Sequence, residues 1–172
     1  MALSLPVQAG DHRQGPADAP VALVEYGDYQ CPYCGQADTV VKEVRRQFGD
    51  RLCFVFRNMP LTNMHPMAEL AAEAAESAAL QGRFWEMHDI LYENQERLGP
   101  QMIEEAAVRL GLDIVRFNDD VNTRKTLERV RHDVETAIKS GVQGTPSFFV
   151  NGQPVQDWSL AGLTRAIEAA LR

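Results

Sequence analysis

Two cysteines separated by two residues are the part of this sequence best suited to chemistry. They lie in Cys31-Pro32-Tyr33-Cys34, which follows a short apolar run and opens a helical pattern. A helix N-terminus stabilises a thiolate, because unpaired backbone N–H groups and the positive end of the helix dipole face the sulfur. We therefore expect Cys31 to be the nucleophile. Cys34, one turn further on, is expected to be less exposed and to resolve a mixed disulfide formed at Cys31.

The residues between the cysteines suit this position. Pro32 fits the first helical turn, where its missing N–H is not needed. Tyr33 can shape the rim of the site and affect how the sulfurs are hydrogen-bonded. We predict that both support the active site.

Other uses of a C-x-x-C pair fit the sequence less well. A structural zinc site needs four ligands, and the third cysteine, Cys53, lies within a separate apolar run. Haem attachment needs a histidine after the second cysteine, and residue 35 is Gly. We expect no metal, and we predict that Cys53 packs in the core as a small hydrophobic residue.

Glu25 is the most informative single charge, because it interrupts the apolar run Val21 to Tyr26. A carboxylate within a buried strand must be hydrogen-bonded, protonated or functional to offset the loss of water. Burial would raise its pKa. The alternative is a glutamate at the end of the strand that reaches solvent.

Several other polar residues receive ordinary structural interpretations. Asp28, three residues before Cys31, is expected to be a turn residue. The four histidines show no metal-ligand spacing and are expected at the surface or at helix caps: His12, His65, His88 and His132. Three glutamates spaced along one predicted helix are expected to form a solvated face: Glu69, Glu73 and Glu76.

The elements that position the cysteines can be predicted from hydrophobic periodicity. Residues 1–19 have no periodicity and are expected to form an arm or loop. A buried strand at 21–26 precedes an amphipathic helix that runs from Pro32 to a stop at Gly49. A second strand follows at 52–59. Strand, helix and strand in this order predict a right-handed crossover.

The second half of the sequence predicts helices and then a hairpin. About sixty residues beyond Pro60 have a helical pattern with breaks near 82, 99–100, 111 and 122. A further helix carries the stripe Leu127, Val130, Val134 and Ile138. Residues 146–150 and 153–155 are then joined by Asn151-Gly152, a favoured two-residue hairpin turn. A closing helix starts near Ser159.

The sequence resembles DsbA-like thioredoxin-fold proteins from about Asp11 to its C-terminus. The resemblance rests on Asp11-His12, on the run from Gly15 to Gly35 that contains the cysteine pair, and on Gly144-Thr145-Pro146 before the hairpin. It implies an α/β thioredoxin fold, in which helices flank a central mixed sheet and a helical subdomain is inserted. The predicted division is 1–63 for the arm and the β-α-β part, 64–123 for the insertion, and 124–172 for the α-β-β-α remainder.

The resemblance also implies roles for individual residues. The proline at the position of Pro146 is expected to be cis and to lie beside the cysteines, and the backbone at Thr145 is expected to pair with an extended substrate. Glu25 is expected to pass a proton to or from Cys34 during resolution.

The predicted function is a thiol–disulfide oxidoreductase that needs no cofactor. Its expected partners are protein or peptide thiols and disulfides, glutathione among the small thiols, and a redox-recycling partner that the sequence does not identify. Two alternatives stay open: a glutathione-linked transferase or isomerase of the same fold, and a redox-switched peptide-binding chaperone.

Composition excludes other classes of partner. The 172 residues are 45% hydrophobic and 24% charged, as expected of one globular domain. The formal charge is −7 and the 17 Lys and Arg residues are scattered, which argues against nucleic acid. No window reaches the ~20 continuous apolar residues of a membrane span. Because the N-terminus lacks signal-peptide features, we expect a cytoplasmic location, or a periplasmic or exported one if a leader has been removed.

Overall fold

Five strands form one mixed sheet in this computed structural model, which describes residues 1–172. The order across the sheet is β1-β3-β2-β4-β5. Only β2 and β3 run parallel, as expected for two strands joined by a crossover helix. The strands are β1 (His12–Gln14), β2 (Val21–Gly27), β3 (Leu52–Asn58), β4 (Ser147–Val150) and β5 (Gln153–Val155).

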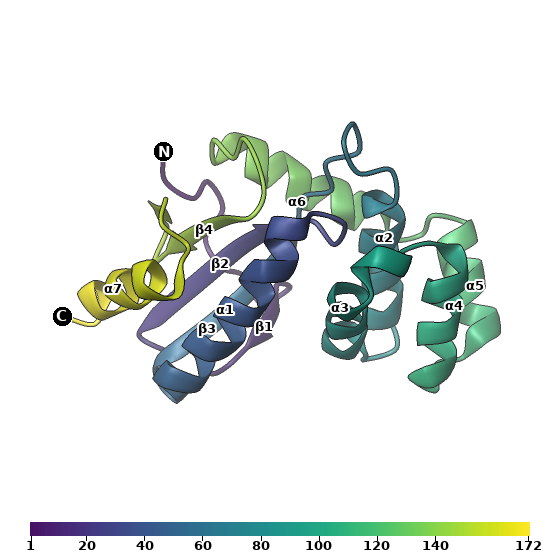
Figure 1. Ribbon diagram of the computed structural model, residues 1–172, viewed down its shortest axis with the longest axis horizontal. Coiled ribbons are helices and arrows are strands. Elements are labelled where there is room, and N and C mark those ends of the chain that lie inside the picture. Colours follow the sequence, from purple (N-terminus) through teal and green to yellow (C-terminus); the bar gives the residue numbers. More distant parts are fainter.

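Helices cover both faces of the sheet and form a separate cluster beside it (Figure 1). Helices α1 (Pro32–Phe48) and α7 (Leu160–Ala170) share one face, and α6 (Leu127–Lys139) packs against β3 from the other. The cluster holds α2 (Ala68–Ala79), α3 (Phe84–Glu93), α4 (Pro100–Arg109) and α5 (Ile114–Asn122). Two short 3-10 turns complete the chain, η1 (Gly49–Arg51) and η2 (Gln95–Arg97). The predicted α/β thioredoxin fold with added helices is confirmed.

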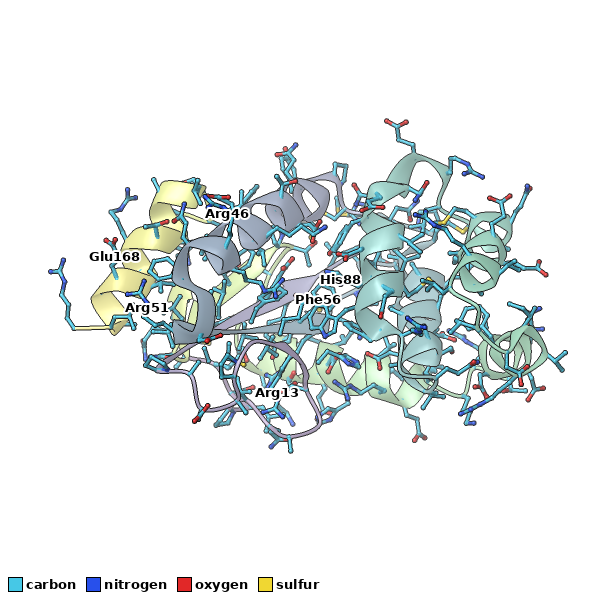
Figure 2. The ribbon with its side chains drawn as sticks, turned by 90° about the horizontal axis from the view of Figure 1, so that it is seen from below. Arg13, Arg46, Arg51, Phe56, His88 and Glu168 are labelled. Carbon is cyan, nitrogen blue, oxygen red and sulfur yellow. The ribbon has the colours of Figure 1, made fainter.

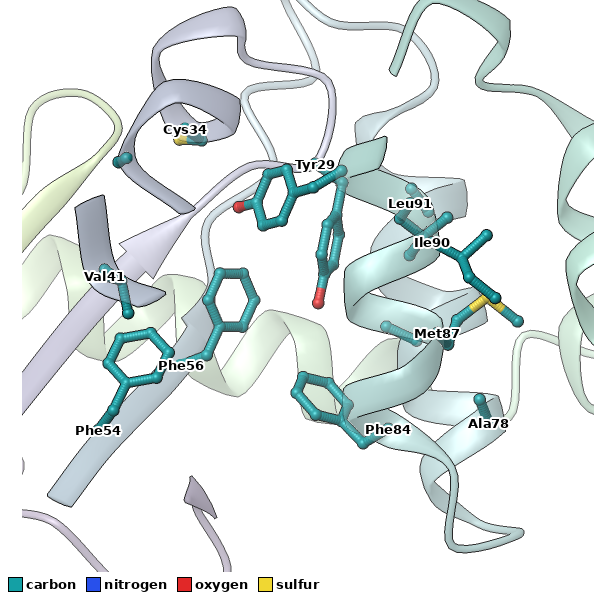
Figure 3. Close-up of a cluster of buried hydrophobic side chains, with 14 of the residues drawn as sticks. Tyr29, Cys34, Val41, Phe54, Phe56, Ala78, Phe84, Met87, Ile90 and Leu91 are labelled. Carbon is teal, nitrogen blue, oxygen red and sulfur yellow. The ribbon is translucent and has the colours of Figure 1, made fainter. Parts of the chain in front are cut away.

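Alternating side chains of the central strands build two cores, because successive residues of a strand point to opposite faces. Leu23, Phe54 and Phe56 face α1 and α7, whereas Tyr26 and Val55 face α6. Since both faces are covered, every residue of β3 is buried. The larger core continues without a break from α1 across β3 into α3, as Figure 3 shows.

The helical cluster shares its core with the sheet. Helix α2 buries a row of alanines, whose small side chains let neighbouring helices approach closely. Phe56 of β3 and His88 of α3 lie where the sheet meets the cluster (Figure 2), with their rings 4.7 Å apart. Helices α2 through α5 lie within residues 64–123, and the assignment of this segment as an insertion stays a prediction. None of the helices combines the length and the apolar character needed to cross a bilayer.

Helix α1 ends, and the β4–β5 hairpin turns, at the residues that the sequence predicts. Gly49 ends α1 with a φ of 53°, a conformation that favours glycine. The hairpin between β4 and β5 turns at Asn151 and Gly152, which have φ values of 46° and 80°. Positive φ at both central residues is the geometry that the Asn-Gly pair favours.

Two predictions about these elements are wrong. The arm at 1–19 contains β1, which pairs antiparallel with β3 and is anchored because the buried Arg57 binds Asp11 at 2.9 Å. Ile138 is 64% exposed, so the predicted stripe of α6 is displaced. The buried face of α6 instead carries Val130, Asp133 and Thr136.

Candidate active site

Cys31 and Cys34 lie at the junction between the central strand β2 and the N-terminus of α1. Cys31 is the residue just before the helix, with extended backbone angles, and Pro32 begins the helix. Both cysteines are free thiols. Cys31 is 3% exposed and Cys34 is fully buried, the order that the sequence predicts. Tyr33, between them, is 61% exposed and forms part of the rim.

The surroundings of Cys31 favour its thiolate. A hydrogen bond from the Cys34 thiol, aided by the Thr145 side chain and by the backbone N–H groups of Cys34 and Tyr33, lowers the pKa of Cys31 to about 5. Burial opposes this shift. Most of the Cys31 thiol is therefore ionised at neutral pH, which is the state that attacks disulfides.

Cys34 has the opposite character. Burial is the largest cause that raises the pKa of Cys34 far above that of a free thiol. The hydrogen bond between Cys34 and Cys31 and the nearby charge of Glu25 raise this pKa further. The backbone N–H of Asp28 lies 3.4 Å from the Cys34 sulfur and donates to it. One thiol of the pair is thus prepared as a nucleophile, and the other keeps its proton until a base removes it.

The loop before β4 brings Thr145 and Pro146 to the cysteines. The Thr145–Pro146 peptide bond is cis. The carbonyl oxygen of Thr145 lies 3.5 Å from the Cys31 sulfur and accepts a hydrogen bond from the thiol form. Beside this loop lies an open pocket of about 430 Å³, lined by Gly144 to Phe149, Pro154 to Gln156 and Trp158 among others.

Glu25 is 1% exposed, so the alternative of a glutamate that reaches solvent is wrong. Its Oε1 atom is buried without a hydrogen-bond partner, and a Cβ at Gly27 would lie 2.9 Å from it. Burial, with smaller contributions from Asp38 and Cys31, raises the pKa of Glu25 well above its ordinary value. The side chain is therefore held as a neutral acid close to the cysteine pair.

Asp28 does more than the turn role that the sequence predicts. Its carboxylate is fully buried and accepts hydrogen bonds from the backbone N–H groups of Gln30 and Cys31, at 2.8 and 3.2 Å. It also accepts from the N–H of Leu61 at 2.9 Å and lies 2.7 Å from Nδ1 of His65. Asp28 thus fastens the Cys31 loop to the segment that leads into α2. Only its position three residues before the cysteine pointed to this role.

The histidine prediction is wrong for His88, whose placement depends on the helical cluster. His88 is 3% exposed, and its ring lies 2.9 Å from the hydroxyl of Tyr29 through Nδ1 and 3.6 Å from Asp38 through Nε2. Burial lowers the pKa of His88. In a neutral ring, Nδ1 accepts from the hydroxyl of Tyr29 at 2.9 Å, and the N–H at Nε2 faces the carboxylate of Asp38.

The predicted solvated face of glutamates is also wrong. Glu73 and Glu76 are 2% and 4% exposed. Glu73 pairs with Arg124, and Glu76 binds His12 at 2.9 Å and the amide of Asn58 at 2.8 Å. These partners come from distant parts of the chain, so the local pattern did not reveal them.

No cysteine beyond the pair adjoins the site. Cys53 is 3% exposed and packs on the face of the sheet that α6 covers, opposite the cysteine pair, as a small hydrophobic residue. Asp38, His88 and Asp89 form the one group of three potential metal-ligating side chains whose ligand atoms all lie within 4.8 Å of one another. The ammonium of Lys42 lies 2.8 and 3.1 Å from the two aspartates and supplies the positive charge there.

Solved structures with the same architecture include an oxidoreductase. The oxidised form of BdbD from Bacillus subtilis has a TM-score of 0.85 and 25% identity, covering 94% of this chain and 93% of that one. A thioredoxin-like oxidoreductase from Silicibacter pomeroyi has a TM-score of 0.81 and 25% identity, covering 95% and 94%. The predicted resemblance to DsbA-like thioredoxin-fold proteins is confirmed.

Curated relatives are much longer than this chain. A protein of Salinispora arenicola named Na(+)/H(+) antiporter NhaA 1 is 46% identical over 161 residues, which cover 93% of this chain and 24% of that protein. A second, Na(+)/H(+) antiporter NhaA 3 of Salinispora tropica, is 49% identical over 143 residues, or 83% and 22%. The chain therefore spans about a quarter of the length of these relatives.

A family model described as Thioredoxin matches residues 8–169, a stretch that includes the cysteine pair, Glu25 and the loop at Pro146. The match covers the whole sheet and all seven α-helices except the last residue of α7. This chain belongs to the thioredoxin family.

Proposed function

We propose that this chain is a thiol–disulfide oxidoreductase that acts on protein or peptide disulfides through Cys31 and Cys34. The observation that carries the proposal is the Cys31 sulfur at the N-terminus of α1, where the pKa of its thiol is lowered to about 5, with a protonated partner thiol next to it. The similar structure from Silicibacter pomeroyi is named a thioredoxin-like oxidoreductase, and this name supports the same class.

The first step is attack by the Cys31 thiolate on one sulfur of a substrate disulfide. A bond forms between Cys31 and that sulfur, the substrate S–S bond breaks, and the second substrate sulfur leaves as a thiolate that takes up a proton. The mixed disulfide then lies beside Thr145, whose backbone we assign to pairing with the extended substrate. The pocket along Gly144 to Phe149 gives such a segment room.

The second step needs the proton of Cys34 to move. Formation of the mixed disulfide removes the Cys31 charge that favours the neutral form of Glu25, and Glu25 then releases its own proton to solvent. The carboxylate accepts the proton of Cys34, because its raised pKa makes it a stronger base than an ordinary carboxylate. The Cys34 sulfur forms a bond to Cys31, and the substrate sulfur leaves as a thiolate. The substrate is reduced by two electrons and the cysteine pair is oxidised. The reverse sequence oxidises a substrate dithiol.

Trapping of the mixed disulfide tests this proposal. A Cys34→Ala variant cannot resolve the intermediate, so incubation with a peptide disulfide should accumulate a covalent adduct at Cys31, seen by mass spectrometry. Cys31→Ser should give no adduct, and Cys53→Ala should turn over like the unchanged protein, because Cys53 is buried on the other face of the sheet. Adducts with glutathione disulfide but with no peptide disulfide would contradict a protein or peptide substrate.

The direction of the reaction in the cell depends on the compartment and on the partner that recycles the cysteine pair, and both are part of the proposal. A cytoplasmic protein would be kept reduced and would act as a reductase or in redox repair, whereas an exported one would serve to introduce disulfides. Equilibration of the protein in glutathione buffers of graded potential, with the Cys31–Cys34 disulfide measured by mass, would distinguish these directions.

A further inference from the structure

The side chain of Gln95 reaches from the helical cluster to the loop that carries Cys31. Gln95 begins η2, between α3 and α4. Its Nε2 donates to the carbonyl oxygens of Tyr29 and Cys31, at 2.8 and 2.9 Å. One amide therefore holds the two carbonyl groups on either side of Gln30.

The same amide packs against the first turn of α1 at Gly35. A Cβ at this position would overlap Oε1 of Gln95 and would lie 2.9 Å from its Cδ atom. Gly35 lies within the helix, where alanine is favoured over glycine by about 1 kcal/mol. The close approach of Gln95 explains why a residue without a side chain occupies this position.

The opposite edge of the loop is also fixed. Asp28 accepts from the N–H groups of Gln30 and Cys31, and the side chain of Gln30 accepts from the N–H of Met67 at 2.7 Å. The carbonyl groups on one edge are thus bound by Gln95 of the helical cluster. The N–H groups on the other edge are bound by Asp28, whose second carboxylate oxygen accepts from the N–H of Leu61. A small rotation of this loop would move the Cys31 sulfur away from the N–H groups of Tyr33 and Cys34.

We propose that Gln95 is a positioning residue for Cys31. Through its hydrogen bonds and its contact with Gly35, the helical cluster fixes the position of the Cys31 sulfur. The inference rests on the proposed function, because it concerns the reaction of the same thiol. It extends that function by making the reactivity of Cys31 depend on a residue of the inserted helices.

The test compares Gln95→Ala, Gly35→Ala and the double variant. The rate of Cys31 alkylation by iodoacetamide is measured from pH 4 to 9, with the modified residue located by mass. Each single change should raise the pH midpoint and slow the reaction at pH 5 about three- to tenfold, the range that corresponds to one or two ordinary hydrogen bonds. The double variant should be no slower than Gln95→Ala, because the added methyl group enters the space that the glutamine has left.

Matched variants separate positioning from general stability. Gln101→Ala removes a glutamine of the same helical cluster that binds only Glu105, and it should leave the midpoint unchanged. Should Gln95→Ala fail to fold, Gln95→Glu keeps the length but lacks the donor, and it should raise the midpoint at least as far. Recovery of the original midpoint by Gln95→Asn would contradict the geometry, because the shorter amide cannot reach both carbonyls.

The proposed role of Gln95 is contradicted if Gln95→Ala lowers the unfolding temperature but leaves the pH midpoint of Cys31 alkylation unchanged. It is also overturned if Gly35→Ala reacts like the unchanged protein, or if the two single effects simply add. Failure of the proposed function is a different result: the unchanged protein would then titrate near pH 9 and form no mixed disulfide.

Discussion

Glu25 lies opposite Phe56 across the parallel pair of β2 and β3, so the buried carboxyl group faces an aromatic ring rather than a cation. The charges that act on it are those of Asp38 and Cys31, and both favour its neutral form. The absence of a compensating positive charge keeps Glu25 protonated while Cys31 is a thiolate, and the Cys31 charge is lost when the mixed disulfide forms. Three properties of the site follow from this arrangement: its pH dependence, its speed of resolution and its stability.

Replacing Glu25 by Gln should slow the resolution step while raising stability at high pH. Loss of a positioned general base typically costs on the order of 10²-fold in rate. Because the folded pKa of Glu25 is raised, its contribution to stability is full below its unfolded pKa and is lost as the pH rises through the folded value. Stopped-flow decay of the mixed disulfide measures the first effect. Urea unfolding of the oxidised protein at pH 5 and 9 measures the second.

Glu93→Gln, which changes an exposed glutamate at the end of α3, is the matched control and should alter neither quantity. Equal resolution rates in Glu25→Gln and the unchanged protein would remove Glu25 from the reaction.

The reaction of Cys31 with iodoacetamide should follow a single ionisation with a midpoint near pH 5. The rate should be constant above the midpoint and should fall in acid, because only the thiolate reacts. The depressed pKa also stabilises the reduced protein, fully above the unfolded thiol pKa and progressively less as the pH falls through about 5. The difference in unfolding free energy between the reduced protein and Cys31→Ser should therefore shrink between pH 8 and pH 4. A midpoint near 9 would contradict the assigned surroundings.

Asp28→Asn should destabilise the protein, because an amide cannot replace both carboxylate oxygens as acceptors. At least one buried N–H group, at Leu61 or at Cys31, loses its partner, at a cost of about 1–3 kcal/mol. Urea unfolding measures the change, and Asp50→Asn, at an exposed aspartate of η1, should change stability by less than about 0.5 kcal/mol. Equal stabilities of Asp28→Asn and the unchanged protein would show that these contacts do not hold the loop.

Arg57→Met should be among the most destabilising single changes. Arg57 is 1% exposed and binds Asp11, Tyr26 and the carbonyls of Leu5 and Pro6. Its loss leaves a buried carboxylate unpaired, which typically costs about 3–5 kcal/mol. The double variant Arg57→Met with Asp11→Asn should recover part of this loss in urea unfolding. No recovery would mean that the arm is held by other contacts.

Local sequence signals predicted the cysteine pair and the elements around it. Cys31 and Cys34 follow a run of buried residues and open a helix whose apolar positions repeat regularly, and Gly49 marks its end. The hairpin was equally predictable, because asparagine and glycine tolerate the positive φ that the turn requires at Asn151 and Gly152. In each case the information lies within a few residues of the feature.

Contacts between distant segments could not be read from such signals. Gln95 and Cys31 are far apart in the sequence, and nothing near Gln95 marks it as a partner of the loop. Glu76 has the spacing of an exposed helix face, yet His12 of β1 and Asn58 of β3 meet it in the interior. The strand β1 was missed for the same reason, since its three residues become a strand only by pairing with β3.

The two outer strands of the sheet have a consequence for where another polypeptide can attach. Strands β1 and β5 have three residues each, and β5 contains Pro154, which has no N–H to offer. Such short edge strands protect the sheet against edge-to-edge pairing with strands of other chains. We therefore expect an extended substrate to pair with the backbone of the loop at Thr145 rather than with either edge strand, because the Cys31 sulfur lies 3.5 Å from the Thr145 carbonyl oxygen.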